Sequence, residues 1–150
     1  MPRHSEKRQM PYSAAQMYAL VADVKSYPEF LPWCAGARIR SDVQQGEHRL
    51  VEADLVISFK VFRERFGSKV RLFEEQGRIE TEYLDGPFKY LKSWWRFVDS
   101  EGGCEVEFFV DFEFKNAILQ GIIGVVFNEA MQRIVRAFEA RAAALYGGGA

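Results

Sequence analysis

The sequence predicts an α+β fold in which one antiparallel β-sheet curves around a long C-terminal helix. Between residues 37 and 115, apolar and polar side chains alternate with a period of two. This pattern is typical of strands with one buried and one solvent-facing side. A helical pattern then runs from Ala117 to Tyr146. It is the only element long enough to cover the apolar face of such a sheet, at about 1.5 Å of rise per residue.

The composition indicates one globular domain. The chain has 150 residues, of which 48 % are hydrophobic, and its formal net charge is -1. A disordered chain is excluded by this content, and a chain of this length buries enough surface to need no disulfide or metal. We expect one domain over residues 1–150, with a core of 3–146 and a flexible tail of 147–150. Because the charge is nearly neutral, general electrostatic binding to nucleic acid is not expected, although a local patch stays open, and no DNA partner is expected.

The N-terminal region is expected to form a short strand and a capped helix. Residues 4–12 alternate loosely, as a strand would. Ser13 and Gln16 have the spacing of a capping box, in which each side chain bonds the backbone of the other. The following apolar residues have helical spacing and predict a helix of about eleven residues. They are Met17, Leu20, Val21 and Val24.

Residues 27–33 combine two prolines with large apolar side chains. Pro28 and Pro32 disfavour helical geometry in the residues before them. We therefore expect a short helical turn or a packed loop, with apolar side chains that fill the core or line an entrance. These side chains are Phe30, Leu31 and Trp33.

Two strand segments define the expected buried face of the sheet. In residues 51–59 the inward row contains Leu55 and Ile57. In residues 106–114, Val and Phe alternate with carboxylates such as Glu107 and Asp111. The carboxylates could form acid/base pairs, but the alternation puts them on the solvent side. Glycine-containing turns at 45–46, 76–77, 85–87 and 101–103 separate about six strands.

The last helix is expected to start at an Asn116 cap and to pack one apolar stripe on the sheet. Gly121 and Gly124 lie inside it, and each should cost about 0.5–1 kcal/mol relative to Ala. Close approach of a strand or ligand, or tight packing on the sheet, would offset that cost. The apolar stretch 117–127 is shorter than the roughly 20 residues of a membrane span, so none is expected.

Few residues suggest catalysis. His4 and His48 are the only histidines, and both are expected on the surface. No metal-ligand cluster or nucleophile motif is recognisable. Cys34 and Cys104 are expected to be reduced thiols. Since the N-terminus has no apolar signal region, we expect a cytoplasmic protein. Because the residues suggest no catalytic site, we expect that it is not an enzyme.

The pair Trp94–Trp95 should place one indole on each face of its strand. Trp95 shares the inward face with Ser93, whose hydroxyl or a ligand oxygen could accept the indole N–H. Trp94 points outward, as a plain surface aromatic or as part of a patch that touches a partner or membrane.

Three segments together resemble a known family. They are Ser26–Cys34, Asp85–Lys89 and Val110–Asn116, and they include Tyr-Pro-Glu-Phe-Leu-Pro at 27–32 and Asp-Phe-Glu-Phe at 111–114. The chain resembles the coenzyme-Q-binding START-domain family and the related bacterial ribosome-association toxin family over about residues 3–146. The resemblance implies a helix-grip, START-like fold with an apolar cavity between the sheet and the C-terminal helix.

The resemblance implies different functions in its two branches. The coenzyme-Q branch implies non-catalytic binding of ubiquinone by a quinone chaperone that supports respiration. The toxin branch implies binding to the large ribosomal subunit. Trp33 and Trp94 stand where smaller residues are expected in the toxin branch, and the added apolar surface favours the quinone. Polyketide cyclases of the same superfamily are a third class, but they would need polar acid/base groups in the cavity.

We therefore expect ubiquinone, or another lipid, as a bound ligand and no further cofactor. Transient contact with a membrane surface is expected, which would make the protein peripheral at the inner membrane face. Strand parity and the helix stripe predict a cavity wall of Leu55, Ile57, Trp95, Phe97, Phe112, Phe114, Ile118, Ile122 and Val126. Phe30, Leu31 and Trp33 are expected near one mouth.

Overall fold

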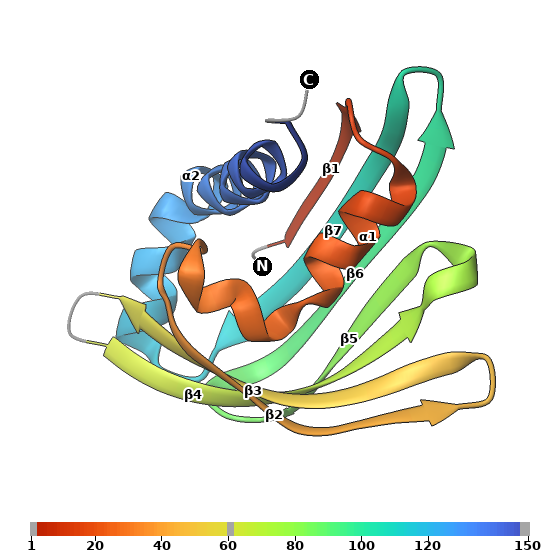
Figure 1. The fold of residues 1–150 in the computed structure, drawn as a ribbon. Helices are drawn as coiled ribbons and strands as arrows, with labels where there is room; N and C mark the ends of the chain where they lie inside the picture. Colours follow the sequence, from red (N-terminus) through yellow and green to blue (C-terminus); the bar gives the residue numbers. More distant parts are fainter. Residues whose placement is uncertain (1–2, 60–61, 148–150) are drawn as a thin grey trace.

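The computed structural model describes residues 3–59 and 62–147, and they form a curved antiparallel sheet that holds a long helix (Figure 1). The predicted fold class is confirmed. The strands follow the order β1-β7-β6-β5-β4-β3-β2 in a 7-stranded sheet. They are β1 (Arg3–Met10), β2 (Cys34–Gln45), β3 (His48–Phe59), β4 (Phe62–Phe73), β5 (Arg78–Asp85), β6 (Phe88–Ser100) and β7 (Gly103–Phe114).

The helices are α1 (Ala14–Ala22), the 3-10 helices η1 (Val24–Glu29) and η2 (Glu74–Gln76), α2 (Ala117–Ala142) and the π-helical turn η3 (Ala143–Gly147). Helices α1, η1 and α2 lie on the concave side of the sheet, whereas η2 joins β4 to β5 (Figure 1). Strands β2 to β7 are joined as successive neighbours, whereas β1 pairs with β7 from the opposite end of the chain. The first and the last strand in chain order are therefore neighbours in the sheet.

The period-two rows lie as the alternation predicts. On β7, every second side chain from Cys104 to Phe114 is buried, and Glu105 is exposed. On β3, Val51 and Ala53 are buried in the same way. Buried and more exposed side chains alternate in these rows because one face of the sheet is covered by the helices and the other faces water.

The capping box of α1 is formed as predicted. The Ser13 hydroxyl accepts a hydrogen bond from the Gln16 backbone N–H at 3.1 Å, and the Gln16 side chain accepts one from the Ser13 N–H at 3.0 Å. The helix has 9 residues and ends at Ala22, so Val24 belongs to η1 instead. Of the two forms expected for residues 27–33, a helical turn is present only as far as Glu29, where η1 ends after including Pro28.

Helix α2 begins at the predicted cap but presents a different face to the sheet. The Asn116 side chain accepts hydrogen bonds from the backbone N–H groups of Ile118 and Leu119. Its buried residues are Leu119, Phe127, Ala130, Met131, Val135, Phe138 and Ala142. Gly121 and Gly124 are exposed, and a Cβ at either would contact nothing within 4 Å. The expectation that close packing offsets their cost is therefore wrong.

Helix α2 also bears on the expectation of no membrane span. By length and composition alone, the stretch Ala117–Gly147 is apolar enough to cross a membrane, and 28 % of its most apolar window is buried. The side chains that it buries pack against the sheet, as those of a core helix do. By length and composition, α2 fits both a membrane span and the core helix of a folded domain.

The structure also bears on the expectations for the histidines, the cysteines and Trp94, and the first of these is wrong. Both histidines are partly buried rather than exposed: His4 faces α2 from the inner side of β1, and its Nε2 lies 2.9 Å from Glu6 Oε1. His48 packs against the Phe73 ring at 4.9 Å between centroids. Cys34 and Cys104 are free thiols. Trp94 points outward and stacks on Phe109 of β7, with ring centroids 5.8 Å apart.

Candidate functional site

An apolar cavity lies between the concave face of the sheet, α2 and the segment that follows α1. Its volume is about 270 Å³, just below the 300–1,000 Å³ typical of ligand pockets. Strands β3 to β7 supply its floor, α2 its roof, and η1 with residues 31–34 one end. The period-two rows produce this wall, because each strand turns its apolar side chains to the same concave face.

Seven of the twelve residues predicted for the cavity lie on its wall. Two follow η1 and five belong to the strand rows, as the sequence predicts. Among the five, Trp95 contributes an indole and is 8 % exposed. The seven are Leu31, Trp33, Leu55, Ile57, Trp95, Phe112 and Phe114. Their role in ligand binding remains a prediction.

The other five predicted residues lie elsewhere. Phe97 is buried but lines a separate groove beside α1. Phe30 packs on Phe138, with ring centroids 5.3 Å apart, so it fills the core and does not line the mouth. The remaining three, Ile118, Ile122 and Val126, are on α2 and outside the wall, and Ile118 is 70 % exposed.

The prediction for α2 is wrong because it assigned the wrong side of the helix to the cavity. At about 100° per residue, Ile118 lies about 160° around the helix from Ile134, which lines the cavity. The first half of α2 is apolar all round, so its periodicity does not select a face. The second half does, since charged residues separate Ala130, Ile134 and Phe138. Extending that stripe backwards would have found Ile123, which also lines the cavity.

Trp33 closes one end of the cavity in an unusual backbone conformation. Its φ is 64°, which makes it the non-glycine residue with a positive φ among those described. This left-handed region is costly for a bulky residue. The ring packs edge-on against Phe59 at 5.9 Å, and the Trp33 carbonyl accepts a hydrogen bond from Ser58 N–H at 2.9 Å. Contacts to β3 therefore hold the strained residue in place.

A few polar groups interrupt the apolar wall. Thr81 of β5 and Ser93 of β6 are paired neighbours that both face the cavity. Within the described residues, neither hydroxyl has a hydrogen-bond partner, and the Trp95 indole N–H donates to none. The Ser68 hydroxyl donates weakly to the Ala53 carbonyl at 3.5 Å. These groups are donors that an oxygen-bearing ligand could use.

The cavity is electrically neutral. Among the described residues that line it, none is Asp, Glu, His, Lys or Arg. Burial raises the pKa of Tyr27 well above its usual range, and its hydroxyl donates to the Val21 carbonyl at 2.5 Å. Burial also raises the pKa of the Cys34 thiol, which therefore stays protonated near neutral pH. The site suits an uncharged apolar ligand and offers no acid/base pair.

No metal centre competes with this cavity in residues 3–59 and 62–147. In that part of the chain, no three His, Cys, Asp or Glu side chains converge so as to hold a metal ion.

Comparison with known proteins supports the resemblance noted in the sequence. Residues 10–139 match the family model described as "Polyketide cyclase / dehydrase and lipid transport". The chain is 41 % identical over 136 residues to "Ribosome association toxin RatA" of Rickettsia prowazekii, covering 89 % of this chain and 90 % of that protein. It is 33 % identical over 149 residues to "Coenzyme Q-binding protein COQ10 homolog B, mitochondrial" of Xenopus laevis, covering 96 % of this chain and 59 % of that protein.

Solved structures show the same fold. The solution structure of the 18 kDa protein CC1736 from Caulobacter crescentus has a TM-score of 0.81 and 35 % identity, and covers 99 % of this chain and 100 % of that one. The Zhui aromatase/cyclase from Streptomyces has a TM-score of 0.78, with 99 % of this chain and 98 % of that one covered. At 14 % identity, this second likeness concerns the fold alone.

Proposed function

The chain belongs to the polyketide cyclase / dehydrase and lipid transport family, and from this premise we propose that it is a ribosome-binding protein of the ribosome-association toxin branch. The observation that carries the proposal is sequence similarity to proteins of this branch over almost the whole chain. Proteins named ribosome association toxin are 41 %, 40 % and 35 % identical in Rickettsia prowazekii, Escherichia coli and Vibrio cholerae. Each match spans at least 90 % of the relative. The proposed target is the large ribosomal subunit, and the proposed location is the cytoplasm.

The convex face of the sheet offers a surface for this role. There, Trp94 stacks on Phe109 at an interplanar angle of 19°, and the exposed side chains of Lys92 and Arg96 flank Trp94 on the same strand, with Arg96 4.0 Å from Glu107. Aromatic rings beside cations suit nucleic-acid bases and phosphates. A local patch of this kind does not need a basic protein, so the net charge of -1 does not exclude it.

Sedimentation tests the proposal directly. The purified chain should pellet with large ribosomal subunits and not with small ones. Trp94→Ser should weaken this association several-fold, because it removes the stacking ring. Leu84→Ser is the matched control, since Leu84 is an exposed apolar residue (38 %) elsewhere on the same face of the sheet. A chain that stays in the supernatant with both subunits would refute ribosome binding.

A second function, binding of an isoprenoid quinone, is favoured by the apolar cavity. The cavity would take an apolar tail by burial, at roughly 25 cal/mol per Å². The Trp95 indole N–H and the hydroxyls of Thr81 and Ser93 could donate to oxygens of the head group. A volume of about 270 Å³ would hold only part of a long polyprenyl tail, so the rest would stay outside. In this role the protein binds the quinone and does not transform it.

Lipid extraction followed by mass spectrometry tests the second function. The wild-type chain should carry a quinone or take it up from detergent. Ile123→Glu should abolish uptake, because Ile123 lines the cavity and a buried carboxylate is costly. Ile118→Glu makes the same change on the exposed side of the same helix and should leave uptake intact. Should Ile123→Glu fail to fold, Thr81→Val and Ser93→Ala test the head-group contacts. Equal uptake by all variants would refute the site.

A further inference from the structure

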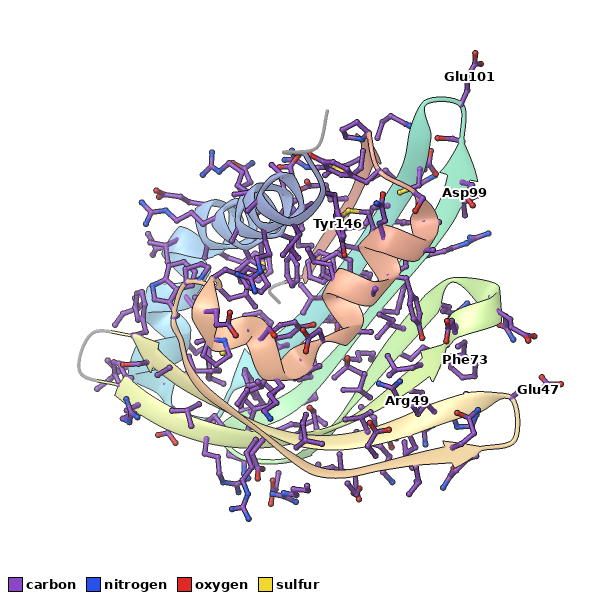
Figure 2. The ribbon with its side chains drawn as sticks, viewed as in Figure 1. Glu47, Arg49, Phe73, Asp99, Glu101 and Tyr146 are labelled. Atoms are coloured by element: carbon purple, nitrogen blue, oxygen red, sulfur yellow. The ribbon has the colours of Figure 1, made fainter. Side chains whose placement is uncertain are left out.

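A second depression lies beside α1, away from the apolar cavity. It is a groove of about 860 Å³ between α1, the Asp23–Lys25 segment, the inner side of β2 and β3, η2 and the end of β6. Figure 2 shows Asp99 and Arg49 at opposite ends of this region. The groove shares only Val24 with the wall of the cavity. Neither function proposed above uses it.

The floor of the groove is apolar. The ring of Tyr18 packs edge-on against Phe97, with centroids 6.0 Å apart, and Val51 is buried beside them. Exposed alanines of α1, Ala15 and Ala19, form one side without bulky side chains. An extended aliphatic stem could lie along such a floor.

The rim of the groove is acidic. Its carboxylates are Asp23, Asp42, Glu74, Glu75 and Asp99, and its cations are Lys25 and Arg49. Asp42 already pairs with Arg49 at 2.9 Å, and Asp99 accepts the backbone N–H of Ala14 at 2.9 Å. Glu74 and Glu75 are exposed and have no ion pair within the described residues. Negative charge thus remains available on the η2 side of the groove.

Tyr18 provides a second, independent observation. The residue is only 9 % exposed, and its hydroxyl, which is not itself buried, has no hydrogen-bond partner in the described part of the chain. The residue lines both this groove and the adjoining depression that contains Glu47. Burial raises the pKa of Tyr18 to about 12, so the hydroxyl remains a donor at neutral pH. The ring is buried while the hydroxyl reaches the groove, where it is free to donate to an acceptor on a bound ligand.

We propose that this groove binds a basic peptide segment, whose Lys or Arg side chains lie on the apolar floor and pair with Glu74 and Glu75 while a backbone carbonyl accepts from Tyr18. Lys and Arg combine an aliphatic stem with a cationic head, which matches an apolar floor with an acidic rim. A polyamine would satisfy the carboxylates but offers no acceptor to the tyrosine hydroxyl. The acidic rim would repel RNA. The inference does not depend on ribosome or quinone binding.

Fluorescence anisotropy with labelled peptides tests the proposal on the full chain. A short peptide alternating Lys and Ala should bind, and its Glu–Ala counterpart should not. Glu74→Gln/Glu75→Gln should weaken binding about fivefold, because two exposed ion pairs are lost. Tyr18→Phe keeps the ring against Phe97 and should weaken binding about threefold by loss of one hydrogen bond.

A charge-matched variant controls for non-specific attraction. Glu101→Gln/Glu105→Gln removes the same charge from exposed positions outside the groove and should bind like the parent chain. The proposal is overturned if this control loses as much affinity as the Glu74/Glu75 variant. It is equally overturned if the Lys–Ala peptide does not bind, or if Tyr18→Phe leaves its affinity unchanged. Thermal unfolding of each variant confirms that the fold is retained.

Discussion

At the scale of single residues, Phe138 joins three parts of the molecule. Its ring lies 5.0 Å from Trp95 of β6, 5.6 Å from Tyr27 of η1 and 5.3 Å from Phe30, measured between centroids. It is 4 % exposed. One side chain of α2 thus ties the helix both to the sheet and to the segment that closes the cavity.

Phe138→Ala should therefore lower the free energy of unfolding by about 3–5 kcal/mol, through lost burial and the void left behind. Urea denaturation measures this change. Val125→Ala is the control, because Val125 lies on the same helix and is 87 % exposed, so a change within about 0.5 kcal/mol is expected. Similar losses in both variants would show that Phe138 does not have this central role.

Two tyrosines with raised pKa values predict a loss of stability at high pH. Burial raises the pKa of Tyr18 to about 12 and moves that of Tyr27 in the same direction, from an ordinary value of 10.0. The folded state therefore favours the neutral phenols. Their contribution is complete below the unfolded pKa of about 10 and is lost as pH rises through the folded values.

Urea denaturation between about pH 9 and pH 12 should show the free energy of unfolding falling with pH. In Tyr18→Phe/Tyr27→Phe the fall should be shallower, because two titrating groups are gone. The comparison concerns slopes, since the variant also loses the hydrogen bond from Tyr27 to the Val21 carbonyl. A slope equal to that of the parent chain would contradict the assignment.

At the scale of elements, α2 carries an apolar surface that nothing in the described chain covers. Ile118 is 70 % and Val125 is 87 % exposed, and Gly121 and Gly124 lie on the open side as well. The glycines therefore lower helix stability without any packing in return.

Gly121→Ala and Gly124→Ala should each raise the free energy of unfolding by about 0.5–1 kcal/mol. Thermal or urea unfolding measures both. Gly77→Ala is the opposite control, because Gly77 has a φ of 60° and a Cβ there would collide with the Phe97 carbonyl oxygen. Destabilisation by the two helix substitutions would mean that these glycines do have a close neighbour.

At the scale of the whole molecule, β1 connects the N-terminal segment to both the last strand and the C-terminal helix. It pairs with β7 from Arg3 opposite Asp111 to Met10 opposite Cys104, and Arg8 also reaches Glu139 of α2 at 2.9 Å. The sheet, α2 and the N-terminal strand should therefore unfold together. We expect one cooperative transition, as for a single domain.

Deletion of residues 1–10 should abolish that transition or cause aggregation, because it leaves the edge of β7 unpaired and uncovered. Circular dichroism and light scattering measure the two outcomes. A truncated chain that stays monomeric and unfolds cooperatively would show that β1 is dispensable.

Much of the sheet could be predicted from local pattern, because strand alternation has a period of two and each residue has one of two faces. The rows of β3 and β7 and the caps at Ser13 and Asn116 follow from this and from capping chemistry. The partly buried position of His4 could not be predicted, because it depends on β1 lying under α2.

By itself, the sequence determined the fold class, the order of the elements, the inward rows of the strands and the resemblance to the family. Each of these depends only on residue type and on the spacing of residues that are close in the chain. The tertiary structure decided which side of α2 faces the cavity, since the first half of that helix is apolar all round and only contact with the sheet selects a face. It also decided that Phe97 belongs to the groove, and that Tyr18, Glu74 and Glu75 meet there. These residues are far apart in the chain, and only the curvature of the sheet brings them together.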